Sequence, residues 1–230
     1  MKNYFALLSL SLLSPLYFMC GYAATVITTL PFTITQPGAY VLGKNLTYAG
    51  TSNAITVDAS NVLIDLKGFS IPFSGTTGMS GIVVSSSSSN VTIQNGAVFN
   101  FFINISLDGP EATIQNLRLE TGETGGGGTS VWAFPGATSC IIQNCFIAGN
   151  GNQDDGITVQ QCSDVLVKNN HIVAEARGII SSSNNWIVSN YVDSCAIGLS
   201  LSPNDKYQGN VTTLCTTPFT GGIAVGTGNN

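Results

Sequence analysis

The chain has 230 residues, which is enough for one domain with a sizeable core. Charged residues make up only 8% of it, against about 25% in an average globular protein, and glycine is abundant with 26 residues. Runs of Lys, Glu, Arg and Ala are missing, which argues against long helices. The formal net charge of −5 argues against a nucleic-acid partner, because nucleic-acid phosphates are bound by Lys and Arg.

The first 23 residues have the features of a secretory signal peptide. Lys2 supplies a positive charge, and an apolar run follows from position 5 to position 19. Gly21 and Ala23 are small residues at the positions expected before a cleavage site, so cleavage before Ala24 is predicted. The alternatives are a membrane anchor, for which the run is short, and a lipoprotein at Cys20, which bulky residues precede. We therefore expect a secreted, periplasmic or cell-surface protein with no membrane span after cleavage.

A short block of residues recurs down the chain at an irregular spacing of about 19 to 29 residues. The first and third positions of a block are apolar and the fourth is polar, which is typical of a strand with one buried face. Most blocks end in asparagine, which tolerates a left-handed backbone at a tight corner and can form an amide ladder when corners stack. The copies are 62–66, 91–95, 112–116, 140–144, 165–169, 186–190 and 205–209.

A second strand pattern lies between these blocks, with two inward apolar residues around one outward residue. A third short strand is expected after each asparagine corner. Three short strands in each repeat predict a three-sided β-solenoid. The copies of the second pattern are 54–57, 81–84, 104–107, 130–133, 156–159, 178–181, 198–201 and, as a final strand, 222–225.

This pattern resembles the right-handed parallel β-helix repeat proteins of the pectate-lyase-like superfamily. Segments 34–42 and 61–68 look like the beginning of such a domain. The resemblance implies an all-β, single-stranded right-handed parallel β-helix of about seven to eight coils over residues 47–230, behind an N-terminal cap at 24–46. Lyases, hydrolases, epimerases, tailspikes and non-enzymes share the fold, so the resemblance leaves the activity open.

The strongest candidate site lies on the second strand pattern. Asp155 and Arg177 precede equivalent glycines in neighbouring coils, so stacking places them about 4.8 Å apart. Asp154 adjoins Asp155, Glu175 lies one corner away, and Trp132 faces outward one coil earlier. An aromatic ring, an arginine and carboxylates suit sugar recognition, with Asp154, Asp155 and Arg177 as candidate catalytic residues. The alternative interpretation is a surface ion pair worth about 0–1 kcal/mol.

Two enzyme patterns of the superfamily are incomplete. Residues 152–157 look like part of the polygalacturonase motif, but the Asp pair, Gly-His-Gly and Arg-x-Lys segments of that family are missing. Elimination of the pectate-lyase type would need several calcium ligands and a base. Arg177 is the candidate base, and Asp154, Asp155 and Glu175 are the candidate Ca²⁺ ligands, so no cofactor beyond a possible calcium ion is expected.

A second candidate column lies on the third strand, where Arg118, Phe146 and His171 occupy successive coils. We interpret it as a weaker substrate-binding set, because a lone histidine at a polar corner is more often simply solvated. The five cysteines after the leader are interpreted as apolar core residues.

The C-terminal end carries no cap, so self-association or a partner is expected there.

Two functional alternatives remain. One is a protein that contacts carbohydrate, by binding or by catalysis, and the other is a structural or adhesive surface protein.

Overall fold

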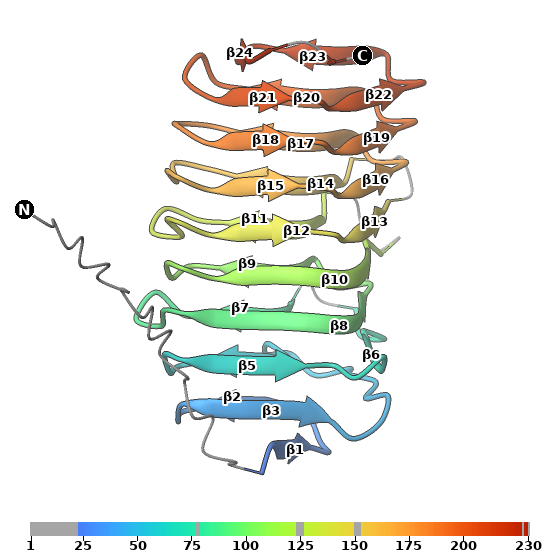
Figure 1. Ribbon diagram of the computed structural model, residues 1–230. Helices are drawn as coiled ribbons and strands as arrows, with labels where there is room; N and C mark the ends of the chain where they lie inside the picture. Colours follow the sequence, from blue (N-terminus) through green and yellow to red (C-terminus); the bar gives the residue numbers. More distant parts are fainter. Residues whose placement is uncertain (1–22, 77–78, 123–126, 150–152, 227, 230) are drawn as a thin grey trace, which may run out of the picture.

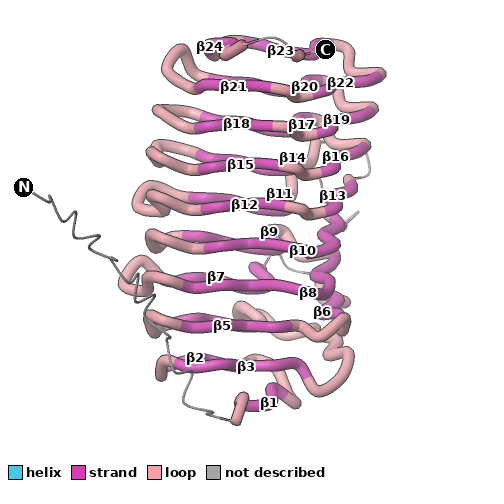
Figure 2. The backbone as a smooth tube through the Cα atoms, in the orientation of Figure 1, coloured by secondary structure: helices cyan, strands magenta, loops and turns pink. Residues whose placement is uncertain are grey.

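A computed structural model of the chain describes residues 23–76, 79–122, 127–149, 153–226 and 228–229. The predicted signal peptide lies outside the described residues, apart from Ala23. The regular structure of the described residues consists of β-strands, wound into a solenoid of about 8 turns (Figures 1 and 2). Every strand pairing is parallel, which confirms the predicted parallel β-helix. No helix in the described part of the chain is long and apolar enough to cross a membrane.

The coils have three faces. The first face contains β1 (Thr25–Ile27), β3 (Gly38–Leu42), β5 (Val62–Asp65), β8 (Val91–Phe99), β10 (Thr113–Glu120), β12 (Ile141–Gln143), β15 (Leu166–Lys168), β18 (Trp186–Val188), β21 (Lys206–Gln208) and β24 (Ile223–Ala224). The second face, which we call sheet B, contains β2 (Phe32–Ile34), β4 (Ile55–Val57), β7 (Ser80–Val84), β9 (Ile103–Leu107), β11 (Thr129–Ala133), β14 (Asp155–Val159), β17 (Arg177–Ser181), β20 (Ile197–Leu201) and β23 (Thr217–Thr220). The third face contains β6 (Ser70–Pro72), β13 (Phe146–Ala148), β16 (His171–Val173), β19 (Tyr191–Asp193) and β22 (Val211–Thr213), and β8 and β10 continue onto it.

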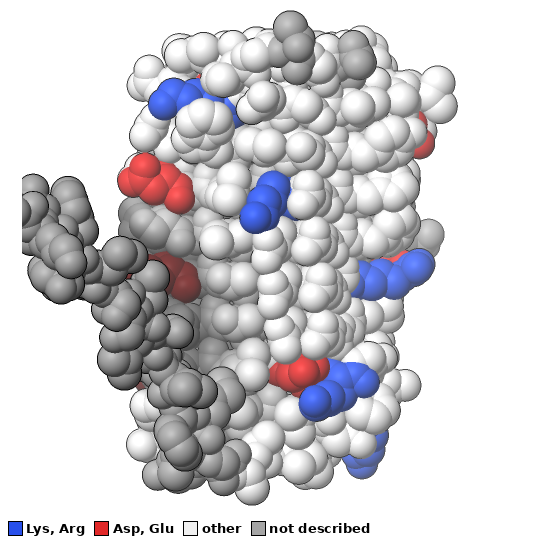
Figure 3. Space-filling view, viewed as in Figure 1, with Lys and Arg blue, Asp and Glu red and all other residues white. Residues whose placement is uncertain are grey.

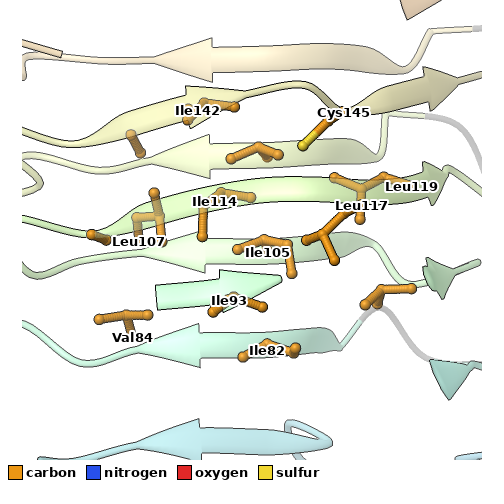
Figure 4. Close-up of a cluster of buried hydrophobic side chains, with 14 of the residues drawn as sticks. Ile82, Val84, Ile93, Ile105, Leu107, Ile114, Leu117, Leu119, Ile142 and Cys145 are labelled. Carbon is orange, nitrogen blue, oxygen red and sulfur yellow. The ribbon is translucent and has the colours of Figure 1, made fainter. Parts of the chain in front are cut away.

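The core is built from columns of identical or similar apolar side chains. Ile93, Ile114 and Ile142 are in register on the first face and fully buried. Ile82 and Ile105 stack in the same way on sheet B and meet them inside the coil (Figure 4). Burial of these side chains follows from the alternation in each strand, and a fully buried aliphatic side chain contributes about 1.5–3 kcal/mol.

The predicted left-handed corners are confirmed at four of the five asparagines. Their φ angles lie between 54° and 59°, at Asn95, Asn116, Asn144 and Asn169. The expected ladder is present where the Asn116 amide donates to the side-chain oxygen of Asn95 at 3.4 Å. Asparagine is favoured at these corners because its short polar side chain tolerates the left-handed region.

Two predicted alignments are wrong by register. Lys168 pairs with Val188, so the left-handed corner of that coil is Ser189, with φ of 55°, and not Asn190. The segment 222–225 does not continue sheet B, because β23 occupies that place and Ile223 pairs with Lys206 on the first face. In both cases the length of the preceding corner differs between coils, and strand pairing decides the register.

Four of the five cysteines are buried, as expected for core residues, and all five carry free thiols. At the N-terminal end β1 pairs with β3, and the role of residues 24–46 as a cap stays a prediction.

Candidate functional site

The outer surface of sheet B brings together the first set of predicted site residues. Trp132 lies in register between Ser106 of β9 and Thr158 of β14. Asp155 pairs with Arg177 of the next coil, as the repeat alignment predicted. Sheet B therefore carries the Trp132 ring and the Asp155–Arg177 pair on one continuous surface.

Asp155 and Arg177 form a two-pronged ion pair. The Arg177 Nε donates to Asp155 Oδ1 and its Nη2 to Oδ2, both at 2.7 Å. The side chain of Asp155 is only 12% exposed, whereas that of Arg177 is 48% exposed. Burial raises the pKa of the Asp155 carboxyl; the Arg177 partner opposes this rise and the charge of Asp154 adds to it. Both groups are thus engaged with each other and stabilise the junction of β14 and β17.

Asp154 and Glu175 form a buried acidic pair at the corner between the third face and sheet B. Each is 1% exposed. The Asp154 Oδ1 accepts a hydrogen bond from the backbone N–H of Gly128 at 2.8 Å. Its Oδ2 and both oxygens of Glu175 have no hydrogen-bond partner among the described residues. A side chain at Gly149 would collide with the Glu175 carboxyl, so glycine leaves the space that this carboxyl fills.

The environment of Glu175 favours its neutral form. Burial, followed by the charges of Asp154 and Asp155, raises its pKa from 4.5 to about 8. At neutral pH Glu175 is therefore mostly a protonated carboxylic acid beside Asp154. Neither Asp154 nor Glu175 therefore reaches the outer surface of sheet B.

These acids do not form the calcium site that the sequence suggested. Asp155 is turned outward to Arg177, while Asp154 and Glu175 are buried at the corner. Among the described residues, no three His, Cys, Asp or Glu side chains are grouped so that they could hold a metal ion.

Beside Trp132 lies a groove that the sequence did not reveal. Trp132 stacks on Phe134, with ring centroids 4.6 Å apart and ring planes at 13°. Phe134, Pro135, Asp108 and Ser106 line one part of an open groove of about 370 Å³. Its other lining residues are Asn53, Ser80, Val83, Ser86 and Ile103. Phe134 lies two positions after Trp132, and Asp108 lies two positions after Ser106, just beyond the ends of β11 and β9. The alternation of inward and outward residues therefore predicts that both side chains face outward, and this pattern could have revealed the groove.

The second predicted set lies on the third face and not on sheet B. Arg118, Phe146 and His171 stand in register in successive coils, as predicted, and the column continues to Tyr191, which the sequence analysis missed. The Arg118 guanidinium lies 5.2 Å from the centre of the Phe146 ring and also pairs with Glu120. The His171 ring packs edge-to-face on Phe146 and Tyr191, at 5.2 and 4.9 Å.

The two predicted sets therefore occupy different faces. Trp132, Asp155 and Arg177 share sheet B, whereas the column from Arg118 to Tyr191 belongs to the third face. The face toward the viewer in Figure 3 carries few charges, and its Lys and Arg residues are scattered singly over a mostly uncharged surface. Where described residues are visible in this view, they form no strongly charged patch.

Comparison with known proteins finds a similarity of structure. No protein-family model matches the chain, and no curated protein matches it. Among solved structures, the chain is similar to an alginate lyase from Paenibacillus sp. str. FPU-7, with a TM-score of 0.59 at 14% identity. The similarity covers 86% of this chain and 78% of the other. At this identity the likeness shows the fold alone, a parallel β-helix.

Proposed function

We propose that the outer face of sheet B binds a polysaccharide chain. The observation that carries the proposal is the open groove lined by Phe134 and Asp108, with Trp132 stacked against Phe134. Aromatic rings pack on the apolar faces of sugar rings, while serine hydroxyls and a carboxylate bind sugar hydroxyls. The structural relative is named an alginate lyase, which is consistent with a carbohydrate ligand for this fold.

Binding is favoured over turnover by the state of the acids. Asp155 and Arg177 are held in their ion pair, and Asp154 is buried. In this proposal Asp155 and Arg177 stabilise the sheet beside the groove, and Trp132 and Phe134 provide the contact surface. The signal peptide predicted at residues 1–23 would deliver the protein to the exterior or periplasm, where such polymers occur.

Cleavage of the polysaccharide is a second candidate function. The observation in its favour is the Asp155–Arg177 ion pair on sheet B, where the Arg177 side chain is exposed and burial raises the pKa of the Asp155 carboxyl. A carboxyl group whose pKa is shifted by burial beside a charged partner is a candidate for acid–base catalysis. A structural or adhesive role without any small ligand is the remaining alternative.

Binding is tested with the purified protein and a panel of neutral and acidic polysaccharides, with and without calcium. We expect retardation in affinity electrophoresis by at least one polymer, and a dissociation constant weakened about tenfold or more by Trp132→Ala, about 1.4 kcal/mol. The matched control is Trp186→Ala, because Trp186 is the exposed tryptophan of the first face. If no polymer is retained, or if both variants weaken binding equally, sheet B is not the binding face.

Catalysis is tested in the same incubations by following new reducing ends and unsaturated products. Turnover that is lost in the Asp155→Ala/Arg177→Ala double variant, while polymer binding is kept, would establish an enzyme that uses this pair. Absence of both turnover and retention would favour the structural or adhesive alternative.

A further inference from the structure

The charge of the sheet B groove restricts the chemistry of its ligand. Asp108 is the one lining residue with an ionisable side chain, and no Lys, Arg or His lines the groove in the described part of the chain. The Ser106 hydroxyl donates to Asp108 Oδ1 at 3.1 Å, and Oδ2 of this carboxylate accepts no hydrogen bond among the described residues. The groove is therefore acidic and hydroxyl-rich.

The residues around the groove do not reverse this charge. Asp58 stands in the same outward column two coils earlier, where it accepts a hydrogen bond from Ser85. Of the basic residues that belong to the strands, Arg177 is the one on sheet B, and its Nε and Nη2 are both engaged by Asp155. The other basic residues of the described strands lie on the first and third faces, namely Lys168, Lys206 and Arg118.

A polymer with a carboxylate on each sugar would meet this groove with repulsion and no partner. Two like charges repel more strongly near a protein surface than in bulk water, and no cation in the groove offsets this. An uncharged polymer would instead donate sugar hydroxyls to Asp108 and lay its apolar ring faces on Phe134 and Val83. Ser80 and Ser106 provide further hydroxyl partners.

We infer that the sheet B groove selects an uncharged polysaccharide and discriminates against polyuronates and other carboxylated polymers. This inference rests on the proposed function and specifies its substrate class. A site that binds polyanions would need a cation, whereas this groove contains the carboxylate of Asp108.

The test compares polymers that share a backbone and differ in charge. The pairs are hydroxyethyl cellulose with carboxymethyl cellulose, and highly methyl-esterified pectin with polygalacturonate. Dissociation constants of the purified protein are measured at about 20 mM and about 300 mM salt, where the Debye length falls from about 20 Å to about 6 Å. We expect the uncharged member of at least one pair to bind about tenfold or more tightly at low salt, with the difference shrinking several-fold at high salt.

Substitution at Asp108 locates the discrimination. In Asp108→Asn the preference for the uncharged member should shrink several-fold, because the amide removes the repulsion and keeps the shape of the side chain. The matched control is Asp164→Asn, which changes an exposed carboxylate at a corner outside the groove and should leave the preference unchanged. Circular dichroism of both variants checks that they are folded.

The outcomes separate this inference from the function on which it rests. Suppose that polymers bind and that Trp132→Ala weakens their binding, but that the carboxylated members bind at least as tightly as the uncharged ones. Polysaccharide binding by sheet B then stands, and the inferred selectivity is wrong. A preference that persists undiminished in Asp108→Asn also contradicts it. If no polymer of either charge binds, the proposed function fails and the selectivity fails with it.

Discussion

Glu175 is the residue whose chemistry departs furthest from what its position in the repeat suggests. It lies in a corner that the following coil fills with Cys195, whose neighbour Ala196 donates its N–H to the Glu175 carbonyl. A carboxyl group thus occupies a place that suits a small apolar side chain. It is accommodated because it holds a proton, since an ionised carboxylate without hydrogen bonds is costly to bury.

The raised pKa of Glu175 predicts a pH-dependent stability. Between pH 4.5 and about 8, the Glu175 carboxyl keeps its proton in the folded protein and loses it in the unfolded chain. The contribution to the free energy of unfolding is complete below pH 4.5 and is lost as the pH rises through this window. Since each pKa unit corresponds to about 1.4 kcal/mol, the loss should be on the order of a few kcal/mol, measured by urea unfolding between pH 5 and pH 9.

The variant Glu175→Gln separates this effect from other titrations. Glutamine resembles the protonated acid in shape and cannot ionise, so the decline toward pH 8 should flatten and the variant should be more stable than the wild type at pH 9. Asp164→Asn is the control, since its carboxylate is exposed and its loss should leave the profile unchanged. An unaltered pH profile in Glu175→Gln would contradict the assigned proton.

At the scale of elements, the coils are joined inside by a column of buried asparagines. The Asn170 amide donates to Asn190 Oδ1, and the Asn190 amide donates to Asn210 Oδ1, each at 3.0 Å. The Asn190 amide also donates to the carbonyl of Val167, and its oxygen accepts the backbone N–H of Asn170. These bonds satisfy backbone groups that the corner withdraws from the strand ladder.

Asn190→Ala should therefore destabilise the β-helix strongly. It removes the acceptor of the buried Asn170 N–H and the two hydrogen bonds that the Asn190 amide donates to Val167 and Asn210. An unsatisfied buried group costs about 1–3 kcal/mol, so we expect a loss of about 2–5 kcal/mol in urea unfolding. Asn184→Ala is the matched control at an exposed corner and should cost about 0.5 kcal/mol or less. Equal effects of the two substitutions would show that the buried column does not stabilise the stack.

At the scale of the whole molecule, the solenoid offers an open strand edge at its C-terminal end. Within the described residues, β23 pairs with β20 alone and β24 with β21 alone. Leu214 is 85% exposed and Ile223 is 49% exposed at this end. Unpaired strand edges with apolar side chains are templates for pairing with another chain.

We predict that the chain self-associates through this end. Sedimentation velocity should show an average mass that rises with protein concentration, and Ile223→Lys should reduce the rise, because lysine at a strand edge opposes pairing. Trp186→Lys places the same charge on the side of the stack and should not change it. A constant monomer mass at high concentration would argue against self-association.

The sequence by itself determined the class of fold and much of the stacking. Alternation of apolar and polar residues requires one buried face per strand, and the asparagine corners require a left-handed backbone, so coils and core columns follow from local chemistry. The neighbours Asp155–Arg177 and Arg118–Phe146–His171 could be predicted for the same reason, because stacked coils place equivalent positions side by side.

Only the tertiary structure decided the features that depend on corners of unequal length. Strand pairing, and not the apparent block boundary, placed Ser189 at a corner and Asn190 inside. The same holds for the burial of Asp154 and Glu175, and for the groove that joins Phe134 to Asp108 across coils. Corner lengths set how far each coil is displaced against the next, and a displacement of one residue moves a side chain from the surface to the core.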